Sequence, residues 1–125
     1  MEITEVARHS GLSVDTIRFY EKTGMLPPIA RDGRGWRRFD PNTADWLRNL
    51  GRLRATGMPL RDMRRFAELV HDQGAGTPEA AQERLAILRR HGERLIARQK
   101  ELDACVAFLN QKIAVYETWE GRKDD

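Results

Sequence analysis

Arginine side chains gather in one stretch of the sequence and supply the groups best suited to bind a polyanion. The segment 31–65 contains ten Arg and four Asp, and 18 of the 22 basic residues of the chain are Arg. The planar guanidinium offers paired hydrogen bonds to phosphates and guanine edges, which a lysine ammonium does not. The pattern favours nucleic acid as the partner and leaves two alternatives open, an acidic protein and a solvated surface.

Charge is distributed unevenly along the chain. Residues 1–70 carry 13 basic and 9 acidic residues, a net charge of +4, whereas residues 71–125 carry 9 and 10, a net charge of −1. A third of all residues are charged, which suggests much surface per unit of core. We therefore expect a basic head that binds a polyanion and a nearly neutral support.

Other chemistries lack the residues they need. No acid–base pair, nucleophile with its base, or phosphate-binding loop is evident, so an enzyme is not expected. Cys105 is the single cysteine and His9, His71 and His91 are scattered, so we expect no metal and no cofactor. The sequence has no leader and no apolar run of membrane-spanning length, which predicts a cytoplasmic, nucleoid-associated protein.

Two short helices in close succession are predicted at the start of the chain. Thr4 is expected to cap the first helix and Gly11 to end it. Ser13 is expected to cap the second, which carries Ile17 on its apolar side and ends at Gly24. Two helices of about two turns, joined by a turn that contains glycine, form the helix-turn-helix pattern.

A basic hairpin is predicted directly after this helix pair. Two strand-like pieces, 29–31 and 36–39, flank the turn residues Asp32, Gly33 and Gly35. An ordinary hairpin loop is the alternative, but the position after the helix pair favours a wing. Its basic and aromatic residues are Arg31, Arg34, Trp36, Arg37, Arg38 and Phe39.

Two further helices complete the predicted head, residues 1–74. Asp40 and Pro41 begin the third helix, Gly57 ends it, and Pro59 precedes the fourth. The glycine-rich segment 73–76 is the expected boundary. The residues expected to face the core are Leu47, Leu50, Leu53, Met63, Phe66, Ala67 and Val70.

The segment 77–120 is predicted to form one long helix with an apolar seam. Two series of residues recur every seven positions and are offset by four, as in a coiled coil. About 42 residues would give a rod of roughly 60 Å, which cannot bury such a seam alone. We expect a second copy of the chain to cover it. The seam residues proposed for dimerisation are Leu85, Leu88, Leu95, Leu102, Val106, Leu109 and Ile113.

Three motifs together resemble the MerR family of bacterial transcriptional regulators. They are ITEVARHSGLSVDTIRFYEKTGML, then RDGRGWRRFD, then LRATGMPLRDM, followed by the long terminal helix. The resemblance implies a mainly α fold, in which a winged helix-turn-helix head with a small β-hairpin precedes an antiparallel coiled-coil dimerisation helix. It covers essentially the whole chain.

Helix-turn-helix geometry and the resemblance nominate DNA-binding residues. Early residues of the second helix meet base edges in this motif, which nominates Asp15 and Thr16. Asp15 would read a cytosine amino group or only cap the helix. The resemblance implies that Arg18 and Tyr20 grip DNA from this helix. It also implies wing contacts by Arg31, Trp36, Arg37, Arg38 and Phe39, with Trp36 where the family usually has Tyr.

The resemblance also implies a mechanism. Such dimers bind a pseudo-palindromic promoter in double-stranded DNA and bend and untwist an overlong spacer, so RNA polymerase is affected indirectly through the promoter. Bending about 20–30 bp costs on the order of 1–6 kcal/mol, which contacts permitted by the bend offset. The alternatives are a coiled-coil protein that binds an acidic partner and an architectural or excisionase-like DNA binder.

The signal that controls such a regulator is not evident in the sequence. Metal-sensing branches use cysteines at the start of the dimerisation helix and in a short loop after it, and this chain has none at either place. A branch that senses aldehydes or nitrosative stress has a Cys where this chain has Arg52. Cys105 is interpreted as a small, partly buried residue. A small organic effector is the remaining class, expected where head and coil meet. The aromatic candidates there are Trp46, Phe66, Phe108 and Trp119.

Overall fold

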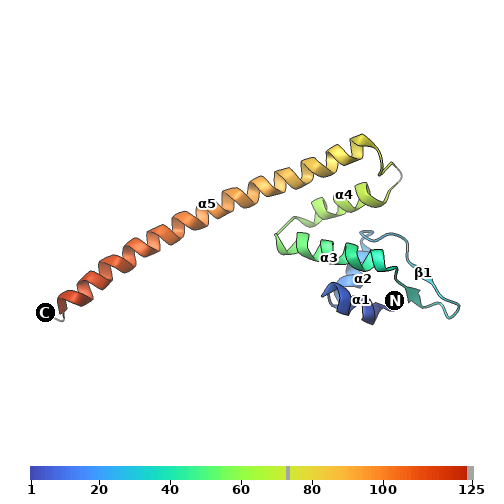
Figure 1. The fold of residues 1–125 in the computed structure, drawn as a ribbon, viewed down its shortest axis with the longest axis horizontal. Helices are drawn as coiled ribbons and strands as arrows, with labels where there is room; N and C mark the ends of the chain where they lie inside the picture. Colours follow the sequence, from blue (N-terminus) through green and yellow to red (C-terminus); the bar gives the residue numbers. More distant parts are fainter. Residues whose placement is uncertain (73, 124–125) are drawn as a thin grey trace. The chain divides into compact units, whose positions relative to one another are not determined.

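The computed structural model describes residues 1–72 and 74–123, which form five helices and one two-stranded antiparallel sheet (Figure 1). The chain divides into two compact units, Met1–Leu88 and Arg89–Asp125. The predicted fold class, mainly α with a hairpin wing and a long last helix, is confirmed. The elements are α1 (Ile3–Ser10), α2 (Val14–Lys22), β1 (Ala30–Arg31), β2 (Arg37–Arg38), α3 (Pro41–Ala55), α4 (Leu60–His71) and α5 (Pro78–Lys123).

The helix-turn-helix is built by local signals at the ends of α1 and α2. Gly11 ends α1 in the left-handed conformation, with φ of 75°, which glycine adopts without steric cost. The Ser13 hydroxyl accepts a hydrogen bond from the Thr16 N–H and caps α2. The predicted Thr4 cap is wrong: α1 begins at Ile3 because the Glu2 carbonyl already accepts from the Glu5 and Val6 N–H groups.

A continuous apolar core lies under the helix-turn-helix. Helix α1 packs against both α2 and α3, and α3 packs against α4. Burying each large side chain contributes about 1.5–3 kcal/mol, so the apolar faces hold these short helices together. The fully buried large side chains are Val6, Ile17, Met25, Leu47, Leu50, Met58 and Met63.

Helices α3 and α4 follow the predicted starts and differ in detail at their buried faces. The Asp40 carboxylate accepts from the Asn42 N–H at 2.7 Å, and Pro41 follows as the first residue of α3. Leu53, Phe66 and Val70 are only half-buried, whereas Leu69, which was not predicted, is buried. The Leu69 carbonyl accepts a hydrogen bond from Arg84 of α5, a contact that the pattern within α4 alone does not reveal.

The first turns of α5 belong to the first compact unit. Arg65 on α4 pairs with Glu83 through two hydrogen bonds of 2.8 Å, and the Arg84 guanidinium donates to the Leu69 and Ala75 carbonyls. Figure 1 shows α4 and the start of α5 side by side. The compact unit therefore runs to Leu88, past the boundary expected at 73–76. Gln73 lies outside the described residues.

The buried side of these first turns is not the predicted seam. Ala80 and Ile87 are buried, at 9% and 3% exposed, whereas Leu85 and Leu88 remain 45% and 41% exposed. One residue along a helix is a rotation of about 100°, so the face packed on α4 and the heptad seam are neighbouring faces of one helix.

The second unit is a single stretch of α5 whose apolar side chains lie open. Over half of the surface of each of several large residues is exposed in the single chain, including Leu102, Val106, Leu109 and Ile113 on the predicted seam. Within residues 1–72 and 74–123, no helix is long and apolar enough to cross a membrane.

The Leu47 side chain tests the core that holds α3 under the helix-turn-helix. Leu47→Ala removes a fully buried side chain and should lower the free energy of unfolding by about 2–5 kcal/mol. Urea denaturation at a fixed protein concentration measures the change. Asn49→Ala, at an exposed position of the same helix, should change it by less than about 0.5 kcal/mol. Equal effects of the two substitutions would contradict this assignment of the core.

Candidate nucleic-acid interface

Helix α2 presents a polar surface opposite the side it buries. Ile17 is fully buried, and Asp15 and Arg18 project from the other side. The Arg18 side chain is 58% exposed, and its guanidinium lies 4.0 Å from the Asp15 carboxylate. Such an exposed pair contributes little to stability, so both side chains are available to an external partner. Thr16 is half-buried, and its hydroxyl accepts from Ser13 at 2.8 Å.

Tyr20 and Phe39, which were both predicted to contact DNA, are largely buried, at 3% and 2% exposed. Phe39 therefore offers almost no surface to DNA, whereas Tyr20 also lines a hollow on the α2 surface with Thr16 and Arg54. Burial raises the pKa of Tyr20, and the nearby Arg54 opposes that rise. These two aromatic side chains instead fix where α2 and the end of the wing sit.

The wing turn is organised by the Asp32 carboxylate. One of its oxygens accepts hydrogen bonds from the Arg34 and Trp36 N–H groups at 2.9 and 3.1 Å. Desolvation alone would raise the pKa of Asp32, but these two N–H groups and the Arg34 guanidinium lower it below its ordinary value. Gly35 takes a φ of 80°, which a side chain would disfavour. The strands pair Ala30 with Arg38 and Arg31 with Arg37.

Glu21 on α2 and Glu2, directly before α1, hold wing arginines. The Arg37 Nε lies 2.8 Å from a Glu21 oxygen, an ion pair without the alignment of a hydrogen bond. Arg38 approaches Glu2 at 3.8 Å, and the Arg34 guanidinium stacks over the Trp36 ring at 4.3 Å. The side chains of the Arg37–Glu21 and Arg38–Glu2 pairs are 26–45% exposed, so water screens these pairs only in part, and a DNA phosphate that replaced either carboxylate would have to repay the lost ion pair.

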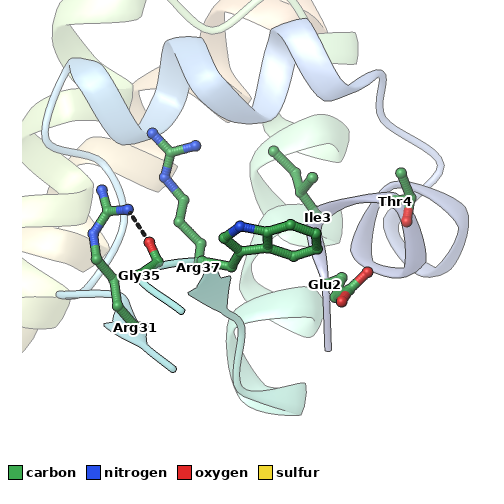
Figure 2. A pocket seen from close by; sticks show the side chains of 7 residues that line it. Glu2, Ile3, Thr4, Arg31, Gly35 and Arg37 are labelled. Atoms are coloured by element: carbon green, nitrogen blue, oxygen red, sulfur yellow. Dashed lines mark hydrogen bonds between the residues drawn. The ribbon is translucent and has the colours of Figure 1, made fainter. Parts of the chain in front are cut away.

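A hollow of about 320 Å³ separates the wing from the start of α1. Figure 2 shows Arg31 and Arg37 extending on the wing side, while Glu2, Ile3 and Thr4 line the α1 side. The Arg31 guanidinium donates to the Gly35 carbonyl at 2.8 Å, which fixes its direction. Trp36, 55% exposed, also lines the hollow and offers an apolar face and an indole N–H. A sugar-phosphate strand matches this mixture of cations and aromatic surface.

Two residues that the sequence did not nominate share the surface of α2, Phe19 on α2 itself and Arg54 on α3. Phe19 and Arg54 line one hollow of about 390 Å³ together with Asp15 and Thr16. Phe19 is 44% exposed although it is a large apolar residue. Arg54 comes from the end of α3, 38 residues after Thr16, so only the fold brings it to this surface. The only sequence feature that could have nominated Arg54 for this surface was its basic charge within the Arg-rich stretch 31–65.

Metal chemistry has no cluster to support it in the part of the chain that the structure describes. No group of three or more His, Cys, Asp or Glu residues is placed to hold an ion there. Cys105 is exposed on α5 in the single chain.

Comparison with known proteins agrees with this geometry. Residues 1–69 match the model of the MerR HTH family of regulatory proteins. The chain belongs to the MerR family. A transcriptional regulator of the HTH type from Haemophilus influenzae is 35% identical over 115 residues, which cover 90% of this chain and 81% of that protein. This MerR-family chain is therefore a DNA-binding transcriptional regulator rather than an enzyme.

Solved MerR-family structures share the fold over nearly all of its length. A MerR-family regulator from Listeria monocytogenes matches with a TM-score of 0.80 and 27% identity, covering 94% of this chain and 86% of that chain. HiNmlR, a MerR-family regulator that lacks the sensor domain and was crystallised on promoter DNA, matches with a TM-score of 0.74 and 33% identity over the same shares.

Arg37 offers the sharpest test of the wing. Arg37→Ala should weaken binding to an operator duplex about tenfold and make the salt slope of log K shallower by about one, because one phosphate contact is lost. Fluorescence anisotropy at several salt concentrations measures both quantities. Arg61→Ala, an exposed arginine on α4, removes the same charge outside the interface. If Arg61→Ala gives the same losses, net charge and not the wing is responsible.

Proposed function

We propose that two copies of this chain form a dimer through α5 and bind a pseudo-palindromic promoter site as a transcriptional regulator. The observation that carries the dimer is the open seam of the second unit. Leu102, Val106, Leu109 and Ile113 are 51–60% exposed and recur at coiled-coil spacing. Water would meet a continuous apolar stripe in the single chain, and an equivalent helix buries it by knobs-into-holes packing. The first-unit residues Leu85 and Leu88 and the half-buried Leu95 extend the stripe.

Each head is proposed to bind one half-site with two surfaces. The start of α2 enters the major groove, where Asp15 and Thr16 meet base edges and Arg18 reaches a base or a phosphate. The wing binds the adjacent backbone through Arg31, Trp36, Arg37 and Arg38. Tyr20 and Phe39 support these contacts from the core. Phosphate contacts set the register of the head, and α2 reads the sequence.

The proposed activity is deformation of the promoter. A dimer that binds two half-sites of an overlong spacer bends and untwists the DNA between them, so that RNA polymerase engages both of its boxes. Family membership and the fold shared with a regulator bound to promoter DNA support the proposal. The deformation cost, on the order of 1–6 kcal/mol, depends on the stiffness of base steps that the protein does not touch.

The seam can be tested by its oligomeric state. Leu95→Asn with Leu102→Asn places two amides in the seam and should convert the dimer to monomers, because unpaired polar groups at coiled-coil core positions are costly. Sedimentation velocity measures the mass. Ile96→Asn changes an apolar residue that is 56% exposed but lies off the seam, and it should leave the dimer intact. A stable dimer of the double variant would show that the seam is placed wrongly.

The deformation can be tested at bases the protein does not contact. Replacing a flexible pyrimidine–purine step at the centre of the operator by a stiff A-tract should weaken binding about tenfold, because bending then costs more. Energy transfer between dyes at the two duplex ends reports the bend directly. The same A-tract placed outside the operator is the control. An unchanged end-to-end distance on binding would exclude bending.

A further inference from the structure

A second basic surface lies at the end of α1 opposite the wing. Arg8 and His9 from α1 and Arg48 and Arg52 from α3 line a hollow of about 460 Å³, and all four residues are exposed. No carboxylate lines it. Glu5 borders it only through a neighbouring hollow that it shares with Arg8 and His9. None of the residues assigned above to DNA contact on α2 or the wing takes part.

The hollow is held in shape by the packing of α1 on α3. The Arg48 guanidinium donates to the His9 carbonyl, which fixes Arg48 as one wall and satisfies a carbonyl in the last turn of α1. Gly51 lets Leu12 lie against α3, because a Cβ at position 51 would stand 2.9 Å from the Leu12 Cδ2 atom. Gly11, Leu12, Gly51 and Ala55 form an apolar floor.

The charges in this hollow differ from those on the proposed DNA surface. Arg18, Arg37 and Arg38 each lie within 4.0 Å of a carboxylate. In contrast, neither the Arg8 nor the Arg52 guanidinium makes a hydrogen bond or ion pair with any other residue among 1–72 and 74–123. Two unpaired guanidiniums above an apolar floor suit carboxylates that carry an apolar side chain beside them.

We propose that this hollow, formed by Arg8, His9, Arg48 and Arg52, docks an acidic segment of a protein of the transcription machinery. The inference rests on the proposed function, since a regulator seated on a promoter works beside RNA polymerase. DNA phosphates would use the guanidiniums but not the floor of Leu12 and Ala55. The hollow also lies at the end of α1 away from the wing, whereas α2 and the wing already bind the duplex.

Purified bacterial RNA polymerase holoenzyme is the probe, titrated against the full-length chain with and without operator duplex. Arg8→Ala with Arg52→Ala should weaken polymerase binding about tenfold in both titrations and leave duplex affinity and its salt slope unchanged. Arg8→Lys with Arg52→Lys keeps the charges and should restore part of the affinity. Arg61→Ala with Arg64→Ala removes the same charge from exposed positions of α4 and should have no effect. Thermal unfolding confirms that each variant is folded.

Three outcomes would overturn the proposal, and a fourth would overturn only the proposed promoter function. A weaker duplex affinity with a salt slope shallower by about two would show that the hollow binds phosphates. An equal loss of polymerase affinity in the Arg61→Ala, Arg64→Ala variant would show that net charge, not the hollow, is responsible. If the Arg8→Ala, Arg52→Ala variant binds polymerase as the wild-type chain does, or if the wild-type chain does not bind polymerase, the hollow does not dock this partner. If the wild-type chain binds polymerase through the hollow but no duplex, the proposed promoter function fails and the docking site stands.

Discussion

The interface depends first on the burial of one side of α2. Ile17 is fully buried and Tyr20 nearly so, and these two side chains decide which residues of the helix remain outside. A helix of nine residues is not stable alone in water, so its orientation comes from packing rather than from its own hydrogen bonds. Rotating α2 by one residue, about 100°, would bury Arg18 and expose Ile17. The core thereby fixes which surface of α2 is open to the proposed contact with the major groove.

The interface depends secondly on ion pairs, because most cations of the wing and of α2 already have an acidic partner in the free protein. Glu21 holds Arg37 and Glu2 approaches Arg34 and Arg38, so the guanidiniums are positioned before any duplex arrives. Because the guanidiniums are already positioned, less side-chain entropy would be lost when DNA binds. Each carboxylate that a phosphate replaces would also lower the net free energy gained from that contact.

Much of this arrangement could be predicted from the sequence because it is encoded locally. Ser13, Asp40 and Gly11 cap or end their helices wherever the chain goes, and the Asp32 turn closes through residues two and four positions away. What could not be predicted depends on distant packing. Arg54 reaches the α2 surface from another helix, and the wing aromatic Phe39 turns inward. Neither fact has a signal in nearby residues, since an aromatic ring suits a core and a DNA groove equally well.

Helix α5 shows how one sequence pattern can hide two interfaces. Its heptad repeat runs through residues 81–116, with Gly92 and Gln99 as the non-apolar members of one series, so periodicity alone predicts one seam and a head that ends before it. In the structure the first turns bury Ala80 and Ile87 on α4 and leave Leu85 and Leu88 open. The Arg65–Glu83 pair and the Arg84 contacts fix this rotation, and their polar residues contribute nothing to an apolar repeat. The helix thus joins the head through one face and keeps the neighbouring face free, which is the face that the proposed dimer would bury.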